Sequence, residues 1–227
     1  MINQGDIMGD IVSMSGVTKS YEKGNIKALN GVNITIKEGD FVSIVGPSGS
    51  GKSTLLNMIG ALDMPDNGHI KVAGQDLLEN KNLNKFRANK IGFIFQLHNL
   101  IPTLSVRENI EIPMYSQKIS SKDIKKRSLE LLDYMGLKSR ADDNITKLSG
   151  GERQRIAIAR SLVNKPSIIL ADEPTGSLDS ENSNNVMNLL KKLHKEQDVT
   201  LIVVTHDNEI ANMADRIMNV RDGKIEE

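Results

Sequence analysis

The stretch GPSGSGKST, Gly46 to Thr54, constrains the fold of this chain more than any other part of the sequence. It follows an apolar run, Phe41–Val45, and precedes a helical pattern over Lys52–Leu62. A glycine-rich loop between a buried strand and a helix lets backbone N–H groups close around phosphate oxygens. The order of strand, loop and helix therefore predicts an α/β core that carries a phosphate-binding site.

Individual side chains of this loop fit nucleotide chemistry. Lys52 can neutralise charge on the β- and γ-phosphates, and the Ser53 hydroxyl can ligate magnesium. The other positions of the expected nucleotide cradle are Gly46, Pro47, Ser48, Gly49, Ser50, Gly51 and Thr54. The strand before the loop and the helix after it argue against the alternative, a glycine-rich turn without a ligand.

Composition narrows the class of protein. The chain has 227 residues, 38% of them hydrophobic, which is enough for one large domain or one with an insert. Its apolar runs are far shorter than the ~20 residues that span a bilayer, and MINQGDIMGD has no apolar signal-peptide core. We therefore expect a cytoplasmic protein. Lysine plus arginine and aspartate plus glutamate both total 29, so no global positive field attracts nucleic acid.

Hydrophobic patterning indicates a mainly parallel sheet with helices between its strands. Strand-like runs occur at Phe41–Val45, Ile91–Phe95, Ile168–Ala171, Leu201–Thr205 and Arg216–Val220. Helical patterns follow at Lys52–Leu62, Ser183–Glu196 and Asn208–Ala214. The first ~40 residues are typical of short antiparallel strands. We predict one domain over 1–227, with the β layer and α/β core in 1–95 and 165–227 and a helical subdomain inserted at 96–164.

A second motif, SIILADEP, ends an apolar strand with Asp172 and Glu173. Adjacent residues at a strand end point to different sides. One carboxylate, Asp172, can therefore hold magnesium while Glu173 faces the attacking water. The alternative of a solvated acidic loop fits poorly after an apolar strand. No Asn-Lys pair of the sequence continues to the aspartate of a guanine-binding motif, so ATP is the expected nucleotide.

From about Val12 to Ile225 the sequence resembles the ATP-binding cassette (ABC) ATPases. LSGGERQR matches that family's signature. It follows Phe95-Gln96 and precedes LADEPTGSLD, which is the order of these motifs in the family. The resemblance implies a P-loop NTPase (RecA-like) core that binds ATP and Mg²⁺. It also implies that two cassettes pair head to tail, so that the signature, Ser149, Gly150, Gly151 and Glu152, closes over ATP held by a second copy or a homologous cassette. The start of the helix after the signature can bind an anion but carries no lysine, which suits a phosphate that is already held by another chain.

Four further positions receive roles through the resemblance. Tyr21 is similar to the aromatic residue that stacks on adenine, although a tyrosine there can also serve packing alone. Gln96 matches the glutamine that contacts magnesium and water. Asp179 matches an aspartate that contacts the other cassette, with helix capping as the alternative. His206 matches the histidine at the γ-phosphate, so Glu173, His206 and Lys52 form the expected catalytic set.

Within the family, KIGFIFQLHNLIPTLSVRENIEIPM and ADEPTGSLD look most like the MacB/LolD type of cassette. The resemblance implies a separate membrane permease as partner, no nucleic acid, and a position on the inner face of the membrane, with export more expected than import. His98 departs from the aromatic residue usual in this subgroup. Two alternatives remain: an ATP-gated regulatory subunit of a membrane complex, and a soluble ABC ATPase that acts on nucleic acid.

The segment Leu97–Met114 is the expected contact with the permease. Its side chains His98, Leu100, Ile101 and Leu104 are more apolar than a soluble loop needs, and a groove among them can receive a short helix. The alternative is that they pack inside the helical insert.

Overall fold

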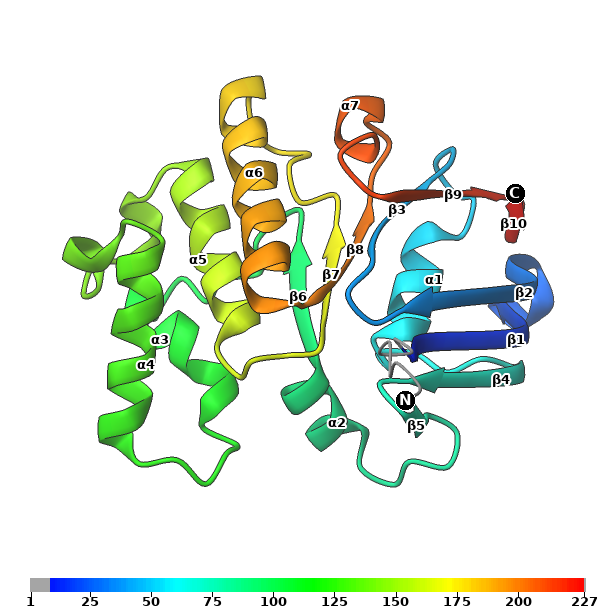
Figure 1. Cartoon of the computed structure of the whole chain (residues 1–227), viewed down its shortest axis with the longest axis horizontal. Coiled ribbons are helices and arrows are strands. Elements are labelled where there is room, and N and C mark those ends of the chain that lie inside the picture. The colour runs from blue at the N-terminus through cyan, green and yellow to red at the C-terminus, as the bar shows by residue number, and fades with distance from the viewer. Residues whose placement is uncertain (1–8, 227) are drawn as a thin grey trace, which may run out of the picture.

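The computed structural model describes residues 9–226, which form two sheets with helices around and between them (Figure 1). Most of the stretch MINQGDIMGD therefore lies outside the described residues. In the described part, no helix combines the length and the apolar character needed to cross a bilayer.

An antiparallel sheet lies at the amino-terminal side of the fold (Figure 1). Its four strands, in the order β2-β1-β4-β5, are β1 (Asp10–Tyr21), β2 (Ile26–Lys37), β4 (Asn67–Val72) and β5 (Gln75–Asp76). The first two strands have 12 residues each, longer than the short strands that the sequence predicted. Register shifts between them bend the pair without ending it, because a bulge accommodates an extra residue within a ladder.

The second sheet is mainly parallel, as predicted. Its order is β10-β9-β3-β8-β7-β6, and only the short edge strand β10 runs antiparallel to its neighbour. The strands are β3 (Phe41–Val45), β6 (Ile91–Phe95), β7 (Ile168–Asp172), β8 (Thr200–Val204), β9 (Arg216–Arg221) and β10 (Lys224–Glu226). The carboxyl ends of β3, β7 and β8 lie side by side, and the predicted motifs follow these strand ends.

Seven α-helices complete the fold. They are α1 (Lys52–Ile59), α2 (Leu83–Lys90), α3 (Val106–Glu111), α4 (Ser121–Tyr134), α5 (Gly150–Leu162), α6 (Ser180–Gln197) and α7 (Asn208–Ala211), counted within residues 9–226. The region 96–164 holds α3, α4 and α5 and no named strand, only one isolated bridge between Ser105 and Asn144. Serine caps fix the starts of α3 and α5, where Ser105 with Glu108 and Ser149 with Glu152 form capping boxes.

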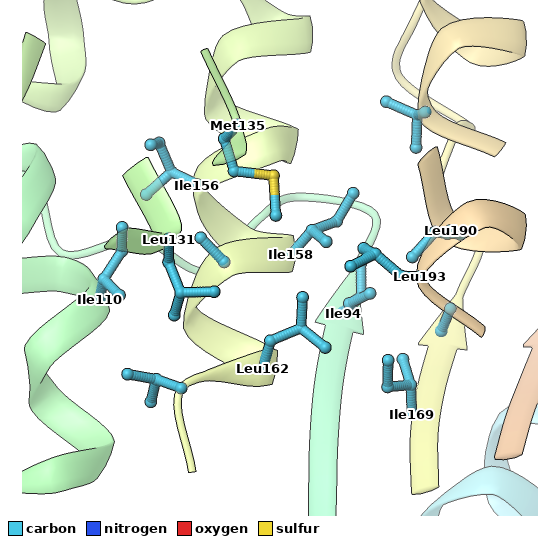
Figure 2. Packing of buried hydrophobic residues seen from close by; sticks show 14 of the residues in the cluster. Ile94, Ile110, Leu131, Met135, Ile156, Ile158, Leu162, Ile169, Leu190 and Leu193 are labelled. Carbon is cyan, nitrogen blue, oxygen red and sulfur yellow. The ribbon is translucent and has the colours of Figure 1, made fainter. Parts of the chain in front are cut away.

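Alternation along the buried strands divides the interior into two cores. Val42 and Ile44 of β3 face α1 and the antiparallel sheet, while Phe41 faces the opposite side. On that side the sheet packs against α5 and α6, and the same core continues to α3 and α4 (Figure 2). The helix that follows the glycine-rich loop is therefore held between the two sheets, which fixes the loop at its start.

The contact between β6 and α5 depends on a glycine. A Cβ at Gly92 would lie 2.5 Å from the Ser161 carbonyl oxygen, so the helix can approach the strand only because this position lacks a side chain.

We predict that Gly92→Ala destabilises the fold. Overpacking of this kind costs about 1–3 kcal/mol, since either the helix or the strand must shift. Urea unfolding followed by circular dichroism measures the change. Gly9→Ala is the control, because a Cβ there meets nothing within 4 Å. Equal stability of the two variants would contradict the close packing of α5 on β6.

Candidate functional site

The loop between β3 and α1 is shaped by two close approaches of backbone. A Cβ at Gly46 would lie 2.1 Å from the Val220 carbonyl oxygen, and one at Gly51 would lie 2.2 Å from that of Ala28. Both glycines also have positive φ, 151° and 106°. Only glycine satisfies both conditions, and the resulting loop keeps its backbone free to surround an anion.

Lys52 lies at the base of this loop. Its side chain is buried, and Nζ donates to the carbonyl oxygens of Gly46, at 2.8 Å, and Pro47, at 2.9 Å. In the described chain no carboxylate forms an ion pair with it. Its charge is thus available to a phosphate placed on the loop.

A cavity of about 710 Å³ opens above the loop. It is lined by Tyr21, Ile26, Ala28, Ser48, Gly49, Gly51, Lys52, Ser53, Thr54, Glu173, Val204 and His206. Of the predicted cradle, Gly46, Pro47 and Ser50 are not among the residues that line this cavity. The Ser50 carbonyl oxygen accepts a hydrogen bond from the Gly223 amide at 3.0 Å, which ties the loop to the turn between β9 and β10.

Ser53 and Asp172 meet at the edge of the loop. The Ser53 hydroxyl donates to Asp172 Oδ1 at 3.3 Å. Burial raises the pKa of Asp172, and the neighbouring charge of Glu173 raises it further. The hydrogen bond from Ser53 acts in the opposite direction and lowers this pKa. A hydroxyl and a desolvated carboxylate side by side are oxygen ligands of the type magnesium prefers, so the residues fit the expected ion.

Glu173 and His206 form a pair beside the same cavity. His206 Nδ1 lies 2.8 Å from Glu173 Oε1, and both residues line the cavity. The Glu173 amide donates to the Val204 carbonyl oxygen at 2.9 Å, and the residue has a positive φ of 48°. This backbone turn directs Glu173 away from Asp172, so the two adjacent carboxylates have different partners, His206 and Ser53.

Gln96 follows β6 and contacts the loop after Glu173. A Cβ at Gly176 would lie 2.7 Å from Gln96 Nε2, and the Ser177 hydroxyl donates to the Gln96 carbonyl oxygen at 3.2 Å. Gln96 itself is exposed and does not line the cavity. The expected contact of this side chain with magnesium stays a prediction.

Tyr21 lies at the rim of the cavity, held by residues that sequence reasoning missed. Its hydroxyl donates to Asp63 Oδ2 at 2.7 Å, and Lys19 Nζ donates to Asp63 Oδ1 at 2.9 Å. Burial and the bond to Asp63 raise the pKa of the Tyr21 hydroxyl. Asp63 follows α1 in a turn, and no motif marks it. No sequence signal marks Ala28 either, although its carbonyl oxygen leaves room only for a glycine at position 51.

The signature residues lie at the start of α5, away from this cavity. Ser149 Oγ accepts from the Glu152 amide at 3.2 Å, and the Ser149 amide donates to Glu152 Oε2 at 2.8 Å. Gly151 packs closely against Asn182, where a Cβ would lie 2.6 Å from Oδ1. None of Ser149, Gly150, Gly151 and Glu152 lines the cavity of their own chain.

Asp179 caps α6 in this chain. Its Oδ1 accepts from the Asn182 amide at 2.8 Å, and its Oδ2 accepts from the Asn182 side chain at 2.8 Å. Helix capping, the alternative raised by the sequence, is therefore present. A contact with a second cassette stays a prediction.

The segment after Gln96 divides between core and surface. Leu100 packs against the core, whereas Ile101 and Leu97 are exposed. His98 and Leu104 are half-buried. The alternative of internal packing thus holds for Leu100.

The sequence profile of the ABC transporter family matches residues 29–176. This range runs from β2 through the phosphate-binding loop and the signature to the loop after Glu173. The chain belongs to the ABC transporter family, as an ATP-binding cassette.

Relatives of known sequence and structure agree with this assignment. The chain is 48% identical to the ABC transporter ATP-binding protein MJ0796 of Methanocaldococcus jannaschii, over 95% of each chain. A dimeric structure of MJ0796 in a post-hydrolysis state, bound to ADP and Pi, superimposes with a TM-score of 0.87 over 95% of this chain and 97% of that one. The lipoprotein-releasing system protein LolD of Bacteroides fragilis is 44% identical over 95% of this chain and all of LolD. A macrolide export protein, MacB of Hyphomonas neptunium, is 45% identical over 95% of this chain and 34% of its own length.

We predict that Tyr21 contributes to nucleotide affinity through its ring. Base stacking on an aromatic side chain contributes about 1–3 kcal/mol, so Tyr21→Ala should weaken binding roughly tenfold. Tyr21→Phe keeps the ring and loses only the bond to Asp63, so its affinity should stay within about threefold of the original. Titration with a fluorescent ATP analogue measures both. Equal affinity of Tyr21→Ala and the unmodified chain would assign the residue to packing.

Proposed function

We propose that this chain is the magnesium-dependent, ATP-hydrolysing subunit of a membrane transporter. The observation that carries the proposal is the contact of Glu173 with His206 at 2.8 Å, beside a cavity whose floor is the loop of Lys52. A carboxylate held next to a phosphate site can orient a water molecule and accept its proton.

The residues divide the work of hydrolysis. Glu173 polarises the attacking water, and His206 holds water and γ-phosphate in line. Lys52 and the loop amides stabilise phosphate charge. Ser53 and Asp172 would hold magnesium, with Gln96 in contact with it, and the bound ion would supply positive charge beside the phosphate oxygens. Positioning and charge stabilisation account for the rate, and no covalent intermediate is expected.

A second copy of the chain completes the site in this proposal. The signature offers backbone N–H groups and a helix dipole to an anion, yet it does not line the cavity of its own chain. The dimeric structure of MJ0796 bound to ADP and Pi supports a pair of cassettes. Asp179 accepts a hydrogen bond from Asn182, which packs against Gly151 of the signature. Asp179 is therefore the expected contact with the second cassette.

The partner outside the pair is a separate permease in the membrane, with the cassette on its inner, cytoplasmic face. Similarity to LolD and MacB favours export or extraction of a lipoprotein, peptide or antimicrobial compound. A groove of about 350 Å³ takes Asn99 and Pro113 of Leu97–Met114 into its lining and supports a docking site there. Leu97 and Ile101 lie on the exposed surface of the same segment, outside the lining of the groove. Phe93, Phe95 and Leu62 give it an apolar lining, which suits the apolar face of a short permease helix.

We predict that Glu173→Gln traps an ATP-bound dimer. The change keeps the shape of the side chain and removes the proton acceptor, a loss of ~10²–10⁴ in rate. The variant should run as a dimer with ATP and magnesium and as a monomer with ADP, as measured by size-exclusion chromatography with light scattering. A variant that stays monomeric at saturating ATP and magnesium would contradict the paired arrangement.

Two substitutions should separate nucleotide binding from dimer closure. Lys52→Ala should abolish ATP binding, because the phosphates lose their cationic partner. Ser149→Arg should leave ATP binding to the monomer intact and block closure, since a bulky cation cannot enter the interface. Equilibrium binding and phosphate release measure the two steps. If Ser149→Arg hydrolysed ATP at the original rate, the signature would have no role in hydrolysis and the proposal would be wrong on this point.

We predict that Ile101→Glu and Leu97→Glu uncouple the cassette from its permease. Both side chains are exposed, 42% and 76%, so the fold should tolerate the charge while an apolar contact would not. Isolated ATPase activity should persist, whereas co-purification of the membrane protein and the transport phenotype should be lost together. Leu100→Glu is the matched comparison, since Leu100 packs in the core and should unfold instead. Retained co-purification would place the docking site elsewhere.

A further inference from the structure

The turn after Gln96 has an unusual backbone. Two consecutive residues, His98 and Asn99, have positive φ values of 62° and 47°. Such conformations cost free energy for residues with a side chain, and they persist only where surrounding contacts hold them. The Asn99 amide donates to the Leu97 carbonyl oxygen at 2.6 Å, which closes the turn but leaves the carbonyls of His98 and Asn99 to other partners.

Arg160, near the carboxyl end of α5, takes both of these carbonyls. Its Nη1 donates to the Asn99 oxygen at 2.6 Å, and its Nη2 donates to the His98 oxygen at 2.7 Å. The guanidinium forms no ion pair with any carboxylate within residues 9–226. A planar fork with two parallel donors fixes both the position and the orientation of what it binds, which a lysine cannot do.

His98 adds a second contact with the same helix. Burial and the charge of Arg153 lower the pKa of its ring, and backbone groups of Leu97 and Gly150 oppose this change. Its Nε2 is buried and forms no hydrogen bond. The ring is therefore a neutral group against the first part of α5, beside the signature. Arg153 and Arg160 are seven residues apart and thus share one face of the helix.

We propose that Arg160 is a positioning residue that clamps the turn Leu97–Asn99 to α5, so that displacement of Gln96 by nucleotide moves the signature at the other end of this helix. The inference rests on the proposed function, because it concerns the pairing of two ATP-bound cassettes. In the proposed function, Gln96 contacts the magnesium that is bound with the ATP of its own chain, so its position depends on that ATP. Through the clamp, that response sets the position of Ser149–Gly151 toward the ATP of the second copy.

Arg160→Lys in the Glu173→Gln background tests the clamp. The charge remains, but one ammonium cannot hold both carbonyls in the same geometry. We expect the ATP affinity of the monomer to stay within about threefold, since the loop of Lys52 is untouched. The ATP concentration for half-maximal dimerisation should rise roughly tenfold, the effect of losing one charge-assisted hydrogen bond. In the chain with Glu173 intact, kcat should fall while the monomer's affinity for ATP is kept.

Arg127→Lys is the matched control. Arg127 also donates to two backbone carbonyl oxygens, those of Val163 and Leu162, both at 3.4 Å, and neither belongs to the turn Leu97–Asn99, so the same change there should leave dimerisation as in the parent. A merely structural role of Arg160 would lower the melting temperature and the monomer's ATP affinity together with dimerisation. That result, or unchanged dimerisation of a folded Arg160→Lys variant, would overturn the proposal.

Hydrogen exchange on the chain without any substitution supplies a measurement that does not depend on a variant folding. At a concentration below dimerisation, ATP and magnesium should change exchange in 97–100 and in 149–153 together. A change confined to the first segment would overturn the clamp. If the Glu173→Gln parent fails to dimerise, the proposed function is wrong, whereas a dimerising parent with an unaffected Arg160→Lys variant contradicts only the clamp.

Discussion

Two carbonyl oxygens, those of Ala28 and Val220, press on the phosphate-binding loop where only Gly51 and Gly46 leave room. They come from different sheets, so the loop is fixed between the antiparallel and the mainly parallel layers. The turn at Gly223 strengthens this arrangement, because it donates to the Ser50 carbonyl and accepts from the Asn30 amide. The cradle is therefore pre-organised by backbone contacts from both sheets, and a phosphate need not order it.

The end of β7 separates two carboxylates that are adjacent in the sequence. Asp172 is the last residue of the strand and faces Ser53, whereas Glu173 turns into a positive φ and faces His206. A regular strand would also separate the two side chains, but it would not bring Glu173 to the end of β8. The bond from the Glu173 amide to the Val204 carbonyl supplies that step.

Local patterns were sufficient to predict five of the six strands of the main sheet, since strands such as β3, β6 and β8 are short apolar runs bounded by polar turns. The short edge strand β10 was missed. Pairing between segments that are distant in the sequence could not be predicted from local patterns. Strands β4 and β5 and helix α2 are polar or short and have weak periodicity, so they were missed. In the site, the glycine-rich loop and the Asp172-Glu173 pair were found as motifs, and Tyr21, Gln96, Asp179 and His206 were found through the resemblance to the ABC ATPases. Asp63 and Arg160 make long-range contacts that no local pattern records.

The segment from Asp172 to Asp179 contacts the other motifs within one short stretch. Asp172 meets the loop of Ser53, Gly176 packs on Gln96, and Leu178 lies close to Gly150 of the signature. Its last residue caps α6 through Asn182, and that asparagine in turn packs on Gly151. These close contacts connect the groups of three motifs along one short stretch of chain. In the proposed function, this segment connects hydrolysis at Glu173 with the position of the signature, which gives a physical reason why hydrolysis and pairing of cassettes should depend on each other.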